Sequence, residues 1–152
     1  VGFILTRQGI PVLEGTSAEG VARGGYVLGG GNPADDADVI IIGTGSELQL
    51  AVEAKKLLAE KDIQAYVVSM PCVEWFESQP QEYRDSVLPP DVSARVAVEA
   101  GVAQSWYKIV GDTGEIVSIE HYGESADDKT LFREFGFTPK AVAAAAERTI
   151  DN

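Results

Sequence analysis

The sequence predicts an α/β fold of three layers, with a mostly parallel sheet of about five strands and helices on both of its faces. Two observations lead to this prediction. Apolar runs of strand length alternate along the chain with amphipathic segments of helix length, which is typical of a parallel sheet with helical crossovers. The run Val39–Ile42 contains four β-branched apolar residues in succession, as expected for a strand that is covered on both faces.

The N-terminal part predicts the end of one domain and a linker to the next. Val1–Leu5 is an apolar run that a Gly-Ile-Pro break soon follows, which predicts a buried strand. The small residues of segment 15–37 are interpreted as a linker, within which Gly25–Gly29 could pair as a short edge strand. We therefore expect residues 1–23 to end a preceding domain of a larger protein, and residues 24–152 to form a C-terminal domain.

The middle of the chain predicts a parallel strand–helix–strand unit. Strand Asp38–Gly43 is followed by a helix that should start at Ser46, because Ser46 and Gln49 have the spacing of a capping box. Ile63–Met70 is the next expected strand, joined to the first by a right-handed crossover. Val73–Val87 predicts one or two short helices that end at a Pro-Pro pair.

The last third of the chain predicts two more strands and three more helices. In chain order these are strand Ala94–Glu99, a helix around Gln104–Val110, a strand at Ile116–Ile119, a helix over Asp127–Phe135 and an Ala-rich helix to about Ile150. Gly136 suits the left-handed position that closes the second of these helices. Thr138 and Pro139 suit the N-cap and first position of the last helix.

The composition argues against several classes of function. With 24 acidic and 12 basic residues the formal net charge is −12, which argues against a nucleic-acid partner and against docking on an anionic membrane. A single Cys cannot form an internal disulfide, which fits a reducing cytoplasm. One His and one Cys cannot build a Cys/His metal cluster, so no metal ligands are predicted in this chain.

Ligands of open parallel sheets bind beyond the carboxyl ends of the strands. The predicted ends are Gly43–Ser46, Ser69–Pro71, Glu99–Gly101 and Glu120–Tyr122. Thr44, Gly45 and Ser46 could offer an anion such as phosphate free backbone N–H groups and the positive end of a helix dipole. The alternative is a plain capped turn, which the neighbouring glutamates favour because they would repel an anion.

Other residues admit a functional and a structural interpretation. His121 could be an acid/base group beside a strand-end glutamate, or a polar residue at a strand end or subunit contact. Cys72 is interpreted as a small buried hydrophobe rather than a nucleophile. The pairs Trp75–Phe76 and Trp106–Tyr107 could anchor a partner or pack in a core. Arg7, at the end of the opening run, could hold a phosphate in a bidentate fork or form an ordinary salt bridge.

Taken in order, segments along nearly the whole chain resemble the C-terminal part of transketolase. They are LTRQGIPVLEG (5–15), GGYVL (24–28), IIIGTGSELQLAVEA (40–54), VVSMPCVEWFESQPQEYRDSVLP (67–89), ARVAVEAG (94–101), WYK (106–108), HYGES (121–125) and LFREFGFTPKAV (131–142). The ordered match is more specific than any single motif. It implies a Rossmann-like C-terminal domain, preceded by the last strand and linker of the domain that binds the aminopyrimidine ring of the cofactor.

The resemblance also implies an activity for the intact enzyme. Transketolases transfer a two-carbon ketol unit from a ketose phosphate to an aldose phosphate in the pentose phosphate pathway, using thiamine diphosphate and a divalent metal, Mg²⁺ or Ca²⁺. In this family the Arg of the TRQ-like motif binds the substrate phosphate, and Arg7 is the matching position. The groups that hold the cofactor and metal lie upstream, so no catalytic residue, cofactor or metal is expected in this chain. The implied partners are the upstream domains, a second subunit of a homodimer and sugar phosphates.

Two alternatives remain open from the sequence. One is a regulatory module that binds an anion or nucleotide at Thr44–Ser46. The other is the matching domain of a different thiamine diphosphate enzyme, such as deoxyxylulose-phosphate synthase or the β subunit of a ketoacid dehydrogenase. The segments SMPCVEWFESQ (69–79) and EFGFTP (134–139) are not expected in those enzymes, and so favour transketolase.

Overall fold

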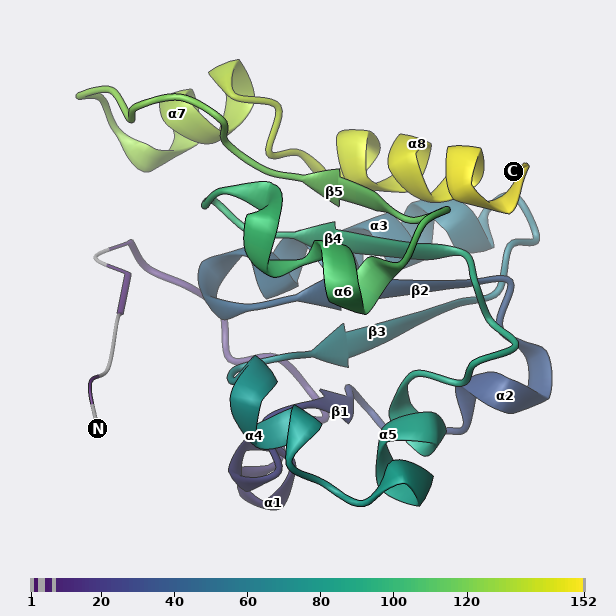
Figure 1. Cartoon of the computed structure of the whole chain (residues 1–152). Helices are drawn as coiled ribbons and strands as arrows, with labels where there is room; N and C mark the ends of the chain where they lie inside the picture. Colours follow the sequence, from purple (N-terminus) through teal and green to yellow (C-terminus); the bar gives the residue numbers. More distant parts are fainter. Residues whose placement is uncertain (1, 3–4, 7, 152) are drawn as a thin grey trace.

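A computed structural model describes residues 2, 5–6 and 8–151 of the chain. Its centre is a five-stranded sheet in the order β1-β3-β2-β4-β5 (Figure 1). The strands are β1 (Tyr26–Val27), β2 (Val39–Gly43), β3 (Ala65–Ser69), β4 (Arg95–Val98) and β5 (Glu115–Val117). All pairs are parallel except β1 with β3, which is antiparallel at one edge. The predicted mostly parallel α/β sheet is therefore confirmed, including the short edge strand.

Helices cover both faces of the sheet (Figure 1). They are α1 (Ala18–Ala22), α2 (Pro33–Asp36), α3 (Leu48–Ala59), α4 (Val73–Glu77), α5 (Gln81–Val87), α6 (Tyr107–Val110), α7 (Asp128–Glu134) and α8 (Pro139–Ile150), with 3-10 turns at Gly45–Glu47 and Ala103–Ser105. The side chains of α3 and α8 pack on one face, and those of α4, α5 and α6 pack on the other.

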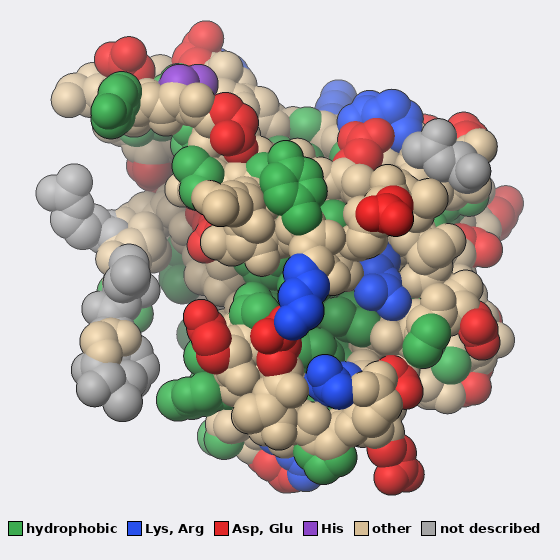
Figure 2. Space-filling model, in the orientation of Figure 1, with side chains coloured by type: hydrophobic (Ala, Val, Ile, Leu, Met, Phe, Trp, Pro, Cys, Tyr) green, Lys and Arg blue, Asp and Glu red, His purple; other side chains and the backbone are tan. Residues whose placement is uncertain are grey.

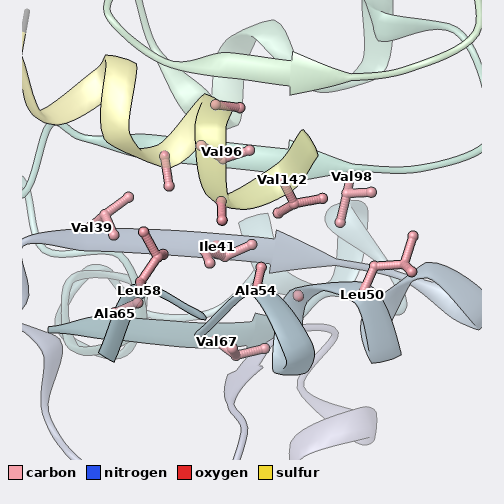
Figure 3. Close-up of a cluster of buried hydrophobic side chains, with 14 of the residues drawn as sticks. Val39, Ile41, Leu50, Ala54, Leu58, Ala65, Val67, Val96, Val98 and Val142 are labelled. Carbon is pink, nitrogen blue, oxygen red and sulfur yellow. The ribbon is translucent and has the colours of Figure 1, made fainter. Parts of the chain in front are cut away.

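The core consists of two apolar clusters separated by the sheet, and β2 contributes to both. Val39 and Ile41 pack with Leu58 of α3 and Val142 of α8, as Figure 3 shows. Ile40, like Ile42, points to the opposite face, towards α4, α5 and α6. Each of these four β2 side chains has no exposed surface. The alternation follows from the two-residue period of a strand, and it explains why the whole run is apolar.

The signals for the last two helices are confirmed. Gly136 follows α7 with a φ of 80°, in the left-handed region that glycine adopts without a steric penalty. The Thr138 hydroxyl accepts a hydrogen bond from the Ala141 N–H at 3.1 Å, and Pro139 is the first residue of α8. Each of these signals depends on residues that are close together in the sequence, which is why the local pattern predicts it.

Three predictions about local structure, an N-cap, a linker and a strand, are not confirmed as made. Ser46 is not the N-cap of α3, because it lies inside the turn Gly45–Glu47 and its hydroxyl donates to a carboxylate. The segment 15–37 is not simply a linker, since α1 and α2 form within it, each with a side-chain cap. The predicted strand Val1–Leu5 lies partly outside the described residues. Of that segment, Leu5 is in no strand and 81% exposed, so no described strand pairs with it.

The guanidinium of Arg95 joins the amino end of β4 to the ends of α5 and α6. It donates to the carbonyls of Leu88, Pro89, Val92 and Ile109, at 3.3, 2.8, 3.0 and 3.0 Å. No carboxylate of the described residues forms a salt bridge with it. Burial lowers the pKa of Arg95 from its ordinary value, although a guanidinium stays charged throughout the physiological range. The charge is therefore stabilised by backbone carbonyl oxygens alone.

We expect Arg95→Met to lower the free energy of unfolding of this chain by about 2–4 kcal/mol, because it leaves several part-buried carbonyls without a donor. Urea denaturation followed by circular dichroism would measure the change. Arg84→Met is the matched control. Its Nε is buried without a hydrogen-bond partner and its Nη2 contacts only the side chain of Gln81, so its loss should cost less than about 1 kcal/mol. Equal losses for the two variants would contradict this role of Arg95.

Candidate functional site

The topology places a switch point at the carboxyl edge of the sheet, between β2 and β4, and we call this region the crevice. The chain leaves β2 towards β3 on one side, whereas β4 lies on the other side of β2 and continues towards β5. The connections after β2 and β4 therefore diverge, and ligands of open α/β sheets bind where this happens. The turn Thr44–Glu47 and the loop Glu99–Val102 meet there, and the Ala100 N–H reaches the Glu47 carboxylate at 3.4 Å.

Glu47 is the most buried carboxylate of the crevice, with 6% of its surface exposed. Its Oε1 accepts from the Ser46 hydroxyl at 2.5 Å, and its Oε2 accepts from the Ala100 N–H. Burial raises the pKa of Glu47 above its ordinary value, the two hydrogen bonds oppose that rise, and the negative charge of Glu99 adds to it. No local pattern predicts this burial, because Glu47 follows a Gly-Ser pair typical of an exposed turn.

Two further glutamates hold the neighbouring loops in place. Glu99 Oε2 accepts from the indole N–H of Trp106 at 2.6 Å. Glu120 Oε1 accepts from the Ala103 N–H at 2.8 Å and from the Ser118 hydroxyl at 3.0 Å. The bond from Glu99 lies within the segment after β4, and the bond from Ala103 to Glu120 connects that segment with the one after β5. The carboxylates therefore form part of the scaffold of this edge.

The crevice is chemically a poor receptor for an anion. The three carboxylates of Glu47, Glu99 and Glu120 give it negative charge, and none of them forms a salt bridge within the described part of the chain. The Ser46 hydroxyl, which an anion would need, donates to Glu47 instead. Anion binding at Thr44, Gly45 and Ser46 thus stays a prediction, and the geometry of this edge argues against it.

The structure separates the remaining candidate residues. His121 is exposed, its Nδ1 lies 2.8 Å from the Tyr122 carbonyl, and its ring packs edge-on against Phe135 with 4.8 Å between ring centres. None of the hydrogen bonds among the described residues joins it to Glu99 or Glu120. Cys72 is half-buried, with its Sγ 3.5 Å from Glu74 Oε2. Arg7 lies outside the described residues.

Each aromatic pair is divided between core and surface. Phe76 and Trp106 are buried, at 3% and 2% exposure, and both belong to the cluster under α4, α5 and α6. Their neighbours Trp75 and Tyr107 are exposed, at 46% and 64%. Consecutive residues of a helical segment point in different directions, so a pair that looks like one unit in sequence has two roles.

A hollow of about 300 Å³ lies on the face covered by α5 and α6. Arg84, Arg95 and Lys108 line it together with Glu77 and Asp85, over an apolar floor, and Figure 2 shows basic side chains around this hollow. Lys108 Nζ lies 2.5 Å from Glu77 Oε1. Because Arg95 donates to four backbone carbonyls, little of its donor capacity is left for a ligand in this hollow.

No group of three or more His, Cys, Asp or Glu residues in the described part of the chain could hold a metal ion. The longest helices there, α3 and α8, have 12 residues each. None of the described helices combines the length and the apolar character that a membrane span requires.

The comparisons with known proteins identify the family. A sequence profile described as "Transketolase-like TK C-terminal domain" matches residues 24–138. The chain belongs to the transketolase family. It is 77% identical to a transketolase of Mycobacterium leprae and 76% identical to one of Mycobacterium tuberculosis, in both cases over 100% of this chain and 22% of the relative. The resemblance noted in the sequence motifs is confirmed.

Solved structures agree with this assignment. The fold matches a transketolase from Leishmania mexicana with a TM-score of 0.86 and 36% identity, over 95% of this chain and 20% of that one. A Pichia stipitis transketolase matches with the same TM-score and coverage at 39% identity. This chain thus spans only about a fifth of the length of its transketolase relatives.

We expect Glu47→Gln to change how stability depends on pH. A carboxyl whose pKa is raised on folding stabilises the folded state below its unfolded pKa, and this contribution is lost as pH rises through the folded pKa. The amide of the variant does not titrate and can still bond to Ser46 and Ala100. Its free energy of unfolding, relative to the unchanged chain, should therefore increase between about pH 4 and about pH 7.

Urea denaturation at a series of pH values would measure that difference. Glu53→Gln, on the exposed side of the same helix α3, is the matched control for losing one negative charge. If the difference in free energy of unfolding between Glu47→Gln and the unchanged chain stays constant or decreases with pH, the raised pKa of Glu47 is contradicted.

Proposed function

We propose that this chain is the C-terminal part of a transketolase that transfers a two-carbon ketol unit from a ketose phosphate to an aldose phosphate. The single observation that carries this proposal is the identity of 76–77% over the whole chain with mycobacterial transketolases. Identity at this level over the whole chain is more than a shared fold alone requires. Residues 24–152 would form the C-terminal domain, and residues 1–23 would join it to the preceding domain.

In this proposal the chain supports the packing of domains and the assembly of a homodimer, and supplies no catalytic residue. Thiamine diphosphate and its divalent metal, Mg²⁺ or Ca²⁺, would be held by upstream parts of the enzyme. The described residues do not fit that cofactor, because its diphosphate would meet the carboxylates of Glu47, Glu99 and Glu120 at the carboxyl edge. The enzyme would act on sugar phosphates in the cytoplasm.

Arg7 is the residue of this chain proposed to contact the substrate. A guanidinium can bind a phosphate through two parallel hydrogen bonds, and both are strengthened by opposite charges. The support for Arg7 is its place in the segment LTRQG (5–9), which matches the phosphate-binding motif of the family. Its flanking residues Thr6 and Gln8 are joined by a hydrogen bond of 3.3 Å from the Gln8 N–H to the Thr6 hydroxyl.

In the intact enzyme, we expect Arg7→Ala to lower kcat/KM for a phosphorylated ketose donor by about 30-fold, the equivalent of losing about 2 kcal/mol of charge-assisted hydrogen bonding. A donor without phosphate should react almost as before. Steady-state kinetics with both donors would measure the ratio, and Arg7→Lys, which keeps the charge but not the fork, should give an intermediate value. Equal losses with both donors would remove Arg7 from the phosphate site.

A regulatory anion site at Thr44–Ser46 is a second candidate. The support for it is the position of this turn at the switch point of the sheet and before the 12-residue helix α3. Calorimetry with inorganic phosphate would test it, on the unchanged chain and on Glu47→Gln, where one repelling charge is gone. Binding that strengthens in the variant would support the site, whereas flat traces at millimolar phosphate in both proteins would exclude it.

A further inference from the structure

The hollow on the face covered by α5 and α6 collects basic side chains in an acidic chain. Its lining contains the basic residues Arg84, Arg95 and Lys108 and the acidic residues Glu77 and Asp85. The whole sequence has 24 acidic and 12 basic residues, so charged side chains drawn at random would be mostly acidic. Instead, basic groups from α5, β4 and α6 converge at this hollow, around which Figure 2 shows basic side chains.

The guanidinium groups of Arg84 and Arg95 have no carboxylate partner among the described residues. The four carbonyls that accept from Arg95 use its donors, so Arg95 contributes mainly its charge. Within the described part of the chain, the guanidinium of Arg84 makes one hydrogen bond, from its Nη2 to Oε1 of Gln81. A guanidinium has more N–H donors than this bond uses. Arg84 therefore keeps both its charge and several donors for a ligand.

The Nε–H of Arg84 is a buried donor without an acceptor. Among the side chains of the described residues, it is the only buried nitrogen or oxygen atom that has no hydrogen-bond partner. Such a donor has lost its bonds to water and gained nothing in return, so these groups are rare and usually have a specific cause. The observed orientation of the Arg84 guanidinium is thus not its best-satisfied one. An acceptor in the hollow that drew the guanidinium towards it would remove this cost.

Gln81 separates Arg84 from the acidic side chain of Asp85. It accepts from Arg84 through Oε1, and its Nε2 donates to Asp85 Oδ1 at 2.6 Å. The amide therefore takes the place of a salt bridge between the two charged residues. An anionic ligand would bind Arg84 more strongly than this neutral amide does, because it adds charge attraction and can accept two parallel hydrogen bonds from the guanidinium. Such a ligand would displace Gln81 from Arg84.

Lys108 offers a second group to the same ligand. Its Nζ lies 2.5 Å from Glu77 Oε1, and the two side chains are 78% and 32% exposed. An ion pair this exposed contributes little to stability, because water and salt screen it. The ammonium group also has more than one N–H donor. Lys108 can therefore keep its contact with Glu77 and still donate to an anion in the hollow.

The floor of the hollow is apolar and belongs to the core. It is formed by Phe76, Leu88, Pro90 and Ile109. Phe76, Leu88 and Ile109 are 3%, 7% and 6% exposed, and all three pack in the cluster under α4, α5 and α6. Such a floor favours a ligand with an apolar part, whose surface leaves water on binding. A volume of about 300 Å³ lies at the lower end of the range for ligand pockets, so the ligand is small.

We propose that this hollow binds a small organic anion, whose phosphate or carboxylate group is held by Arg84 and Lys108 and whose apolar part lies on the floor. The positive charge of Arg95, fixed in place by its carbonyl partners, adds to the attraction. None of the lining residues belongs to the crevice at the carboxyl edge, so this site is separate from the anion site considered at Thr44–Ser46. The proposal goes beyond ketol transfer and does not depend on it.

Photoaffinity labelling of the intact enzyme would test the proposal. The probes are p-azidophenyl phosphate and p-azidobenzoate, which carry the two anionic groups on the same ring, and uncharged azidobenzene is the control. Irradiation followed by peptide mass spectrometry should place the label of at least one charged probe on residues 76–90 or 108–109. Because the labelled peptides are identified one by one, binding at other phosphate sites of the enzyme does not affect the result. The charged probe that labels at the lower concentration identifies the anionic group.

Two pairs of variants connect the label to the basic residues. Arg84→Gln should raise the half-saturating concentration of the charged probe by about 10-fold, because the variant loses the charge and the fork of donors. The matched control is Arg133→Gln, which removes an exposed arginine of α7 that pairs with Glu134 and should leave the concentration unchanged. Lys108→Gln should raise it by about 3-fold, since a single ammonium is lost, and Lys140→Gln on the exposed side of α8 is its control.

Three outcomes would overturn the proposal. Label that is absent from residues 76–90 and 108–109, or that does not saturate, would mean that the hollow binds neither anion. Equal labelling by azidobenzene would mean that the apolar floor alone binds the ring. Equal half-saturating concentrations in Arg84→Gln and Arg133→Gln would mean that Arg84 does not hold the anion. The proposed function is tested separately, through ketol transfer and Arg7→Ala, so its failure and the failure of this site are distinguishable.

Discussion

The complete burial of β2 is the constraint on which the rest of the structure depends. All four apolar side chains of Val39–Ile42 have no exposed surface, and parallel neighbours pair with both sides of the strand. A strand in this position needs a helix layer above and below it, and the apolar side chains of α3, α8, α4, α5 and α6 provide these layers. Since each parallel connection crosses one face, placing β2 between β3 and β4 also determines where the chain reverses direction.

That reversal places helix starts at the carboxyl edge and helix ends at the amino edge, and the acidic and basic side chains at these edges follow this polarity. At the amino edge, the last carbonyls of α5 and α6 have no partner within their helices, and the cation of Arg95 donates to them. At the carboxyl edge, backbone N–H groups are free, and the carboxylates of Glu47 and Glu120 accept from Ala100 and Ala103. At both edges, backbone C=O or N–H groups at the ends of the elements bond to these side chains in place of an oppositely charged side chain.

The sequence predicts the elements well and the crevice poorly, for a physical reason. The β2 run, the Gly136 closure and the Thr138–Pro139 start depend on residues within a few positions of each other, so a local pattern contains the whole signal. Ser46 and Gln49 have an equally good local pattern, yet the Ser46 hydroxyl donates to Glu47, whose other oxygen accepts from a loop 53 positions later. A contact between the ends of two strands cannot be predicted from residues that are close together in the sequence. Here it takes the place of the capping box expected from Ser46 and Gln49.

The same contact changes how this domain can use its switch point. In open α/β sheets, an anionic ligand commonly takes the N–H groups that become free at the carboxyl edge. Here Glu47 and Glu120 accept from such groups, so side chains of the protein occupy part of the space and satisfy the donors that a phosphate would otherwise need. An edge whose N–H donors already bond to carboxylates offers a small anion few hydrogen bonds.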